Sequence, residues 1–383
     1  MNELKSINLF FNRLRYNSGA IWIENESVMF SAPEQFQNQK TYDFISGNKK
    51  IISTILKINQ ISSKEKFLGA IILKHNIVAS YPLSPAQERL WFIEQFEEGT
   101  NAYHIPQIFE LAITTDVEGL KYALQQMVLR HEVLRTTIEQ PDNTDHGVQI
   151  VHDDSMPIEV IAVKGNNNFE SLIIEDINRP FNLSNEFPVR IKFYQIYSTD
   201  DASKDQPNRT VLLVNFHHIA SDGWSIDIFQ NELETYYYEW VKGNRAFRMP
   251  ELEIQYKDFA LWQKTYLDGE ILENQIKYWK EKLSGFQQLN FPVDYVRPVK
   301  VDYKGATQSF ELNRELSNKL RNLCRHNGTT LHSVLLSNLS ILLGKYTRQD
   351  DIITGQPYCK SASETSRRFN WLFCQYTGKQ SIA

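Results

Sequence analysis

The amino-acid sequence predicts an α/β protein made of a small N-terminal module and a larger layered domain. Segments with the periodicity of helices and of strands alternate along most of the chain, which is typical of α/β layers. The chain has 383 residues, more than one average domain needs, and an ordinary globular composition with 42% apolar and 23% charged residues. Residues 1–60 carry a separate pattern of two helical stretches around a hairpin.

The N-terminal module is predicted from local signals. Apolar residues recur at helical spacing between residues 4 and 14. Two strand-like runs, 20–24 and 28–31, flank a polar turn and predict a hairpin. A second helical stretch runs from about residue 41 to 58, where Gly47 could break it.

The larger domain follows a connector at residues 61–80, which has one apolar patch from Phe67 to Leu73. Helices and strands are interleaved over residues 81–383, and the stretch 291–304, which holds two prolines and few apolar residues, indicates a crossing between two lobes. The expected helices cover residues 84–95, 118–135, 168–178, 225–241, 256–267, 272–283, 314–327 and 331–345. The expected strands cover residues 148–152, 189–197, 211–217, 307–311 and 352–355.

Composition excludes several classes of function. A formal net charge of −5 argues against binding nucleic acid. The three cysteines lack metal-ligand spacing and fit a reducing compartment, and the N-terminus lacks the features of a signal peptide. No apolar run approaches the length of a membrane span. We therefore expect a cytoplasmic protein with no bound metal and no nucleic-acid or membrane partner.

Two adjacent histidines form the main candidate site. His217 and His218 end the strand at 211–217, and a turn through Asp222 and Gly223 leads into a helix. Successive strand side chains point to opposite faces, so one imidazole must be held in the structure while the other is exposed. An exposed imidazole suits acid–base chemistry because histidine titrates near physiological pH. Asp222 could fix the turn by pairing with a base, and Gly223 would permit a tight backbone path.

A second cluster of polar residues is expected to be structural. Arg130, His131 and Arg135 fall on one predicted helix, where His131 and Arg135 share a face. Such a position is more typical of a scaffold than of a catalyst. Trp91 and Trp262 are expected to be packing residues, since aromatic side chains dominate core burial.

Five segments in order resemble the motifs of nonribosomal peptide synthetase condensation domains. They are 84–91 (SxAQxRLW), 130–136 (RHExLRT), 215–225 (which contains HHxxxDGWS), 256–262 (YxDYAxW, with Phe259 in place of the second tyrosine) and 350–355 (DDIVIG). The resemblance covers about residues 81–365. It implies a two-lobed fold similar to chloramphenicol acetyltransferase, with the N-terminal lobe and crossover at residues 81–290 and part of the C-terminal lobe at residues 291–383.

The resemblance also implies an activity. Donor and acceptor peptidyl carrier proteins would present thioesters on 4'-phosphopantetheine arms, and no cofactor would be bound covalently to this chain. His218 would be catalytic, either deprotonating the acceptor amine or orienting it and stabilising the tetrahedral species. His217, Asp222 and Gly223 would support the site. The remaining tunnel or scaffold residues implied are Trp224, Ser225, Arg130, His131 and Arg135, and the base expected to pair with Asp222 is Lys345 or Arg348.

The N-terminal module resembles the TubC-type docking domain, through the strand Ile21-Trp22-Ile23-Glu24 and the segment Met29-Phe30-Ser31-Ala32-Pro33. Such domains capture the C-terminal tail of an upstream synthetase subunit. A tail could add to the hairpin as a further strand. The module has seven Lys/Arg and five Asp/Glu, a net charge of +2, which favours an acidic tail. The expected docking residues are Ile21, Trp22, Ile23, Met29 and Phe30.

The C-terminal residues depart from the family pattern. After the DDIVIG segment the family continues with a stretch like SETEGLIGxFVNTL, which is absent from residues 363–383. One set of synonymous codons for residues 368–379, read one base later, encodes ALIGYFVNTLA, which matches the family. We therefore predict that residues from about Ser366 are an out-of-frame tail and that the second lobe is incomplete.

Two other functions stay open. A stand-alone HHxxxDG enzyme could acylate a small alcohol or amine from acyl-CoA, although a docking module argues against it. A truncated chain could instead dock an upstream subunit without catalysis. Comparing transfer from CoA thioesters with transfer from carrier-bound thioesters separates the stand-alone enzyme from a condensation domain. Measuring tail binding alongside amide formation identifies a chain that only docks.

Overall fold

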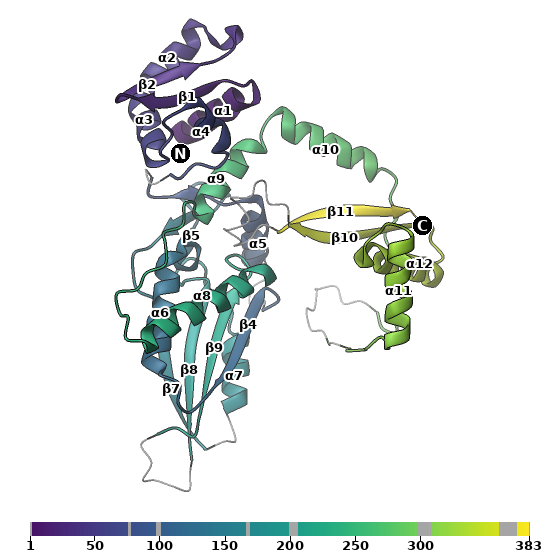
Figure 1. Ribbon diagram of the computed structural model, residues 1–383. Coiled ribbons are helices and arrows are strands. Elements are labelled where there is room, and N and C mark those ends of the chain that lie inside the picture. The colour runs from purple at the N-terminus through teal and green to yellow at the C-terminus, as the bar shows by residue number, and fades with distance from the viewer. Residues whose placement is uncertain are drawn as a thin grey trace. The chain divides into compact units, whose positions relative to one another are not determined.

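The computed structural model describes residues 2–75, 78–96, 101–165, 169–198, 206–296, 306, 308–359 and 374–382 (Figure 1). The chain divides into two compact units. The first contains the described residues up to Asp268, and the second those from Gly269 onward.

The N-terminal module of the first unit is a hairpin surrounded by helices. Its elements are α1 (Asn2–Tyr16), β1 (Ala20–Glu24), β2 (Ser27–Ser31), η1 (Glu34–Phe36), α2 (Gln39–Gly47), α3 (Lys49–Ile58) and α4 (Lys64–Gly69). The helical stretch expected at 41–58 is thus two helices that meet after Gly47. The hairpin turn uses Asn25 and Glu26 at positive φ, which matches the twist of two antiparallel strands.

The core of the module extends beyond the boundary that the sequence suggested. Phe11 of α1, Ile21 of β1 and Ile55 of α3 are fully buried together with Phe67 of α4, and Leu73 belongs to the same cluster. Residues 61–73 of the expected connector therefore belong to the module, because their apolar side chains complete its core.

The larger part of the first unit is a layered α/β structure. Its elements are β3 (Tyr81–Pro82), α5 (Pro85–Phe96), β4 (His104–Leu111), α6 (Val117–Arg130), η2 (Glu132–Arg135), β5 (Thr136–Glu139), β6 (Val148–Val151), β7 (Ile158–Lys164), α7 (Phe169–Asn178), β8 (Val189–Tyr197), β9 (Arg209–His217), α8 (Gly223–Val241) and α9 (Tyr256–Tyr266). One sheet has the strand order β4-β9-β8-β7 and another the order β3-β6-β5.

Strand β9 lies inside the four-stranded sheet and is covered on both faces. Leu212, Val214 and Phe216 join a cluster with side chains of α6 and α8, whereas Val211 and Leu213 pack with those of α7. A strand buried on both faces reads as a continuous apolar run rather than an alternating one, which is why β9 was evident from the sequence.

Strands β4 and β7 were not predicted from the sequence. Both are edge strands of the four-stranded sheet. Strand β4 contains Pro106, which weakens a strand signal but is tolerated at an edge because the missing N–H costs no ladder hydrogen bond there. Strand β7 pairs in parallel with β8.

The second unit contains α10 (Glu270–Lys282), α11 (Arg314–His326), α12 (Leu331–Thr347), β10 (Asp351–Cys359) and β11 (Cys374–Ile382). The last two strands pair antiparallel, from Asp351 opposite Ile382 to Cys359 opposite Cys374. The expected strand at 307–311 is wrong for 308–311, and Thr307 lies outside the described residues. Of the predicted out-of-frame tail, 366–373 lie outside the described residues and 374–382 form β11, so that hypothesis stays a prediction.

Candidate active site at the histidine pair

His217 is the last residue of β9 and is completely buried, with 0% of its surface exposed. Its ring lies edge-on to Phe181 at 5.5 Å and to His104 at 6.2 Å between ring centres. Its Nδ1 accepts the N–H of Ile219 at 3.0 Å, and its Nε2 lies 3.1 Å from Oε1 of Glu94. Both ring nitrogens are therefore occupied inside the protein, as a structural role requires.

His218 has the opposite environment. Its backbone N–H donates to the carbonyl of Tyr103 at 2.7 Å, while its side chain is partly exposed. Among the residues that the structure describes, none forms a hydrogen bond with the His218 ring. The end of the strand thus presents a partly exposed histidine, whose ring has no hydrogen-bond partner in the described part of the chain, beside a histidine whose ring nitrogens are both engaged, which agrees with the alternation predicted from the sequence.

Asp222 and Ser225 form a capping box at the start of α8. The Asp222 carboxylate accepts the Ser225 N–H at 2.8 Å and its hydroxyl at 2.6 Å, and the Ser225 Oγ accepts the Asp222 N–H at 3.3 Å. This cap fixes where the turn after the histidines becomes a helix. Lys345 lies in α12 and Arg348 follows its end, and their pairing with Asp222 stays a prediction.

The expectation that Gly223 permits a tight backbone path is not supported. Its φ is not positive, and a Cβ added there would meet no atom within 4 Å among the described residues. The turn therefore does not need glycine for its backbone path. The next residue, Trp224, is 63% exposed and is not a packing residue within this unit.

Arg130 and His131 bind one carboxylate of α8. Oε2 of Glu232 lies 2.7 Å from His131 Nε2, and its Oε1 accepts from Arg130 Nε at 3.2 Å. Burial alone would raise the pKa of Glu232, but the hydrogen bond from His131 and the charge of Arg130 outweigh it and lower this pKa. Both residues are therefore scaffold that ties α6 to α8.

The helix that carries this motif is shorter than predicted. It ends at Arg130, and Arg135 lies in the 3₁₀ helix η2, so His131 and Arg135 do not share a helical face. Gln255 permits the break, because it donates to the Arg130 carbonyl at 2.9 Å and accepts the Glu132 N–H at 3.2 Å. Arg135 donates to the carbonyl of His152 and to Asp153, which also indicates a structural role.

The first and fourth motifs meet in the core. The Ser84 hydroxyl lies 2.7 Å from that of Tyr256, and Ser84 also caps α5 together with Gln87. Burial raises the pKa of Tyr256, and the nearby charge of Asp222 adds to this. Three motifs that are far apart in the sequence are therefore neighbours around the start of α8.

A buried polar chain joins the N-terminal module to the larger part of the unit. Asn8 of α1 contacts His75 Nε2 at 2.8 Å, and the His75 N–H donates to the Asp258 carboxyl of α9 at 2.7 Å. Burial, with the charge of Lys257 second, lowers the pKa of His75 to about 4. Burial raises the pKa of Asp258 to about 7, despite its two backbone hydrogen bonds.

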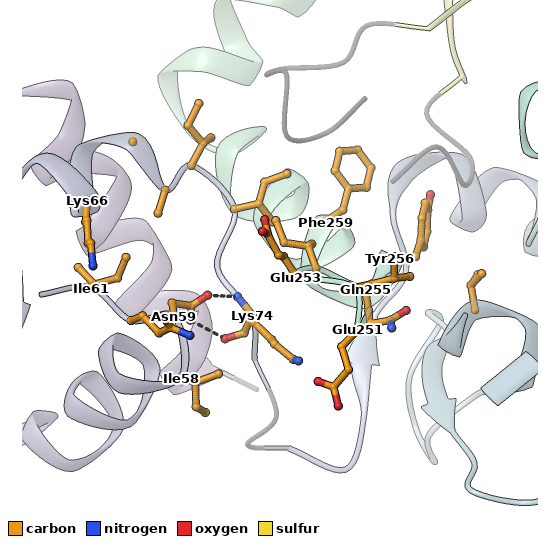
Figure 2. Close-up of a pocket in the computed structure, with 18 of the residues that line it drawn as sticks. Ile58, Asn59, Ile61, Lys66, Lys74, Glu251, Glu253, Gln255, Tyr256 and Phe259 are labelled. Carbon is orange, nitrogen blue, oxygen red and sulfur yellow. Dashed lines mark hydrogen bonds between the residues drawn. The ribbon is translucent and has the colours of Figure 1, made fainter. Parts of the chain in front are cut away.

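A cavity of about 660 Å³ lies along the same seam. In Figure 2, Glu251, Glu253 and Gln255 come from the segment before α9, and Asn59 comes from the module. Asn59 clamps the backbone of Lys74 with hydrogen bonds of 2.7 and 3.0 Å. The residues that line this cavity do not include the histidine pair, so we do not assign it to catalysis.

The expected docking residues do not form one surface. Ile21 is 0% exposed and belongs to the module's core, so it is not available to a partner. Register places Trp22 opposite Met29, which is 38% exposed, on one face of the hairpin. Phe30 packs against α1 and α2 on the other face, and Ile23 is partly buried.

The free edge of the hairpin is on β2. A two-residue turn makes Glu24 and Ser27 a hydrogen-bonded pair, so the N–H and C=O groups of Val28 and Phe30 point away from β1. The matching edge of β1 is partly used, because the Ile23 N–H donates to the Ile61 carbonyl at 2.9 Å. Within the described part of the chain, the outward groups of Val28 and Phe30 have no partner.

Two residues around the pair were missed by the sequence reasoning. Glu94 and His104 both lie close to His217, from α5 and β4. Burial lowers the pKa of His104, whose Nδ1 lies 2.6 Å from the Ile177 carbonyl. No local pattern marks either residue, because their contacts with His217 span more than a hundred positions of sequence.

Membrane-spanning helices and clustered metal ligands are both absent from the described residues. No helix among them is both long and apolar enough to cross a membrane. The same residues contain no group of three or more His, Cys, Asp or Glu side chains that could hold a metal ion.

Comparison with known proteins gives the family. The condensation domain family model matches residues 78–368. One of the linear gramicidin synthase proteins of Brevibacillus parabrevis is 36% identical over 282 residues, which is 72% of this chain and 5% of that protein. Tyrocidine synthase 2 of the same organism is 34% identical over 298 residues, 78% of this chain and 8% of that protein. The chain thus spans only a small part of these relatives.

Solved structures share the fold. The X-domain from teicoplanin biosynthesis is 25% identical with a TM-score of 0.69, over 81% of this chain and 67% of that one. The EpoB cyclization-docking bidomain from Sorangium cellulosum is 18% identical with a TM-score of 0.57, over 98% of this chain and 73% of that one. The match of the family model over most of the sequence is decisive, and the chain belongs to the condensation domain family of nonribosomal peptide synthetases.

Proposed function

We propose that this chain forms an amide bond between a donor acyl or peptidyl thioester and the α-amino group of an acceptor aminoacyl thioester, both carried on 4'-phosphopantetheine arms of peptidyl carrier proteins. The amine nitrogen attacks the donor carbonyl, the new C–N bond replaces the C–S bond, and the donor thiol leaves. The observation that carries the proposal is the partly exposed His218 ring, which lacks a hydrogen-bond partner among the described residues.

His218 can act in either of two ways. It takes the proton from the attacking amine, or it orients the amine and stabilises the charged tetrahedral species. Both roles need a ring nitrogen that no protein group already occupies. Holding two tethered substrates together supplies much of the remaining rate, because it replaces a bimolecular encounter.

A transfer assay with the full chain tests this proposal. Donor and acceptor carriers are loaded with aminoacyl thioesters, and the dipeptidyl product on the acceptor is measured by mass spectrometry. His218→Ala should lower the rate by at least about 100-fold. His146→Ala, at a partly exposed loop position, is the matched control and should leave the rate unchanged. Full activity of His218→Ala would refute the role of this residue.

The same assay addresses the alternatives. Transfer from acyl-CoA that is faster than transfer from the donor carrier would favour a stand-alone acyltransferase. Binding of an upstream tail without any turnover would favour a chain that only docks a partner.

We also propose that the N-terminal module captures the C-terminal tail of an upstream synthetase subunit, and that the tail adds to β2 as a third strand. The unpaired edge at Val28 and Phe30 supports this, as does the likeness to a cyclization-docking bidomain over 98% of the chain. Calorimetric titration of the full chain with an acidic upstream tail peptide tests it. Failure of every upstream tail to bind would contradict it.

A further inference from the structure

Glu94 reaches the histidine pair from the end of α5, a helix whose position is fixed at both its cap and its core face. Ser84 and Gln87 cap its first turn, and Leu90 and Trp91 are buried in the core. The Glu94 side chain is 8% exposed, and Oε1 lies 3.1 Å from His217 Nε2. A buried carboxylate is costly unless it is paired, so this contact must satisfy both groups.

The hydrogen bonds of His217 define its tautomer. The Ile219 N–H is a donor, so Nδ1 must supply a lone pair. In the neutral ring the proton then lies on Nε2, which donates it to the Glu94 carboxylate. We propose that Glu94 is a positioning residue for the reaction: it holds His217 in the Nε2–H tautomer, and this tautomer fixes the peptide that carries His218.

The link to His218 is short and covalent. The N–H of His218 is held by the Tyr103 carbonyl at 2.7 Å, and the next N–H, of Ile219, is held by His217 Nδ1 at 3.0 Å. Only the second of these bonds depends on the tautomer. In the other tautomer, Nδ1 would carry a proton and face the Ile219 N–H, which is also a donor. The peptide that follows His218 would then lose this hydrogen bond.

Two other charged or titratable groups lie near His217, and neither forms a hydrogen bond with its ring among the described residues. His104 of β4 lies across the ring and uses Nδ1 on the Ile177 carbonyl. Arg190 of β8, which stacks on Phe181, binds Glu186 at 2.7 and 2.9 Å. These pairings leave Glu94 as the carboxylate that serves His217.

The test combines a measurement of the tautomer with one of the rate. In the ¹⁵N-histidine-labelled full chain at neutral pH, long-range ¹H–¹⁵N correlations should show His217 as the Nε2–H tautomer. Glu94→Gln keeps an acceptor and should retain this tautomer and a rate within about tenfold of the wild type. Glu94→Leu removes the acceptor; it should lose the single tautomer and lower kcat by about 100-fold, since a displaced catalytic group costs about that much. KM for the carriers should not change, because Glu94 is buried.

Glu88→Gln is the matched control, since it neutralises an acid of the same helix that pairs with Lys264 at the surface. It should change neither tautomer nor rate. The proposal is overturned if His217 of the wild type is the Nδ1–H tautomer, or if Glu94→Leu matches Glu88→Gln in both measurements. The effect on rate rests on the proposed function, whereas the tautomer does not. A wild type without turnover would therefore refute amide formation while the spectra still decide the role of Glu94.

Discussion

Neighbouring histidines take different roles here because the strand ends between them. His217 is the last residue of β9, so its ring enters the layer between sheet and helix. His218 lies one position further, where the backbone still has a sheet-like bond to Tyr103 but the side chain reaches solvent. A single step along the chain therefore separates a fully buried imidazole from a partly exposed one.

Gly119 offers a test of packing at a single residue. A Cβ at this position would lie 2.4 Å from Cδ1 of Trp240, and the indole cannot move freely because its N–H donates to Asp116 at 2.7 Å. Gly119→Ala should therefore destabilise the chain by about 1–3 kcal/mol, despite the better helix propensity of alanine. Urea unfolding measures this.

Gly47→Ala is the control for this substitution. It lies at the end of α2, where an added Cβ meets nothing within 4 Å among the described residues. It should leave the stability unchanged or raise it slightly. If the two substitutions change the free energy of unfolding equally, the Trp240 indole moves aside for the added methyl group.

The sequence could predict the histidines but not what surrounds them. Alternation along a strand is local, so the different roles of His217 and His218 follow from their positions alone. Glu94 lies 123 residues away from His217, and nothing near it in the chain indicates that contact. The tight backbone path expected at Gly223 is not supported for a related reason. Whether atoms crowd a turn depends on residues that are distant in the sequence.

Elements were predicted well where the burial pattern is regular. Helices α8 and α9 were expected within two residues of their observed bounds. The stripe of apolar residues along α8 is regular enough to be recognised in the sequence. Helix α6 was expected to be longer, and it ends early because Gln255, more than a hundred residues away, satisfies its last turn. The edge strand β4 was missed because Pro106 weakens its strand signal.

The free edge of β2 gives a prediction at the scale of an element. Val28→Pro removes an N–H that points away from β1, so the hairpin should survive while a docked strand loses a donor. Tail affinity should fall by about tenfold, the equivalent of about 1.4 kcal/mol. Calorimetry with the full chain measures this.

Val28→Ala keeps the N–H and is the matched control for the backbone. Its tail affinity should stay close to that of the wild type. If both variants bind the tail as tightly as the wild type does, the tail does not pair with β2 at this position.

At the scale of the whole molecule, the module and the larger part of the first unit are joined by a seam of buried polar side chains. Asn8, His75 and Asp258 form a continuous chain of hydrogen bonds across it. Cutting the chain at residue 60 would expose the side chains of Phe67 and Leu73, which complete the core of the module. The sequence shows the apolar patch that contains these two residues, but only the folded structure shows that the patch belongs to the core of the module.

The seam gives a prediction for pH. The pKa of Asp258 is raised to about 7 from an ordinary value near 4, so its contribution to stability falls as pH rises from about 4 to about 7. The pKa of His75 is lowered to about 4 from about 6.5, so its contribution falls as pH drops through that range. The two effects oppose each other and should flatten the stability profile of the wild type.

Substituting either His75 or Asp258 should reveal the pH dependence of stability that the other residue contributes. His75→Gln should lose stability as pH rises from about 4 to 7, by at most about 1.4 kcal/mol per pH unit. Asp258→Asn should lose stability as pH falls below about 6.5. Urea unfolding across this range measures both slopes. Parallel profiles for the two variants and the wild type would show that neither group titrates in the seam.

The short hairpin has a consequence for the recognition of a tail. A strand that adds to β2 can bond only through Val28 and Phe30, so few hydrogen bonds fix its alignment. A slip of one residue would exchange the side chains facing Trp22 and Met29 with those facing Tyr42. If an upstream tail docks as proposed, recognition of the right tail depends on the parity of one backbone alignment rather than on a long run of hydrogen bonds.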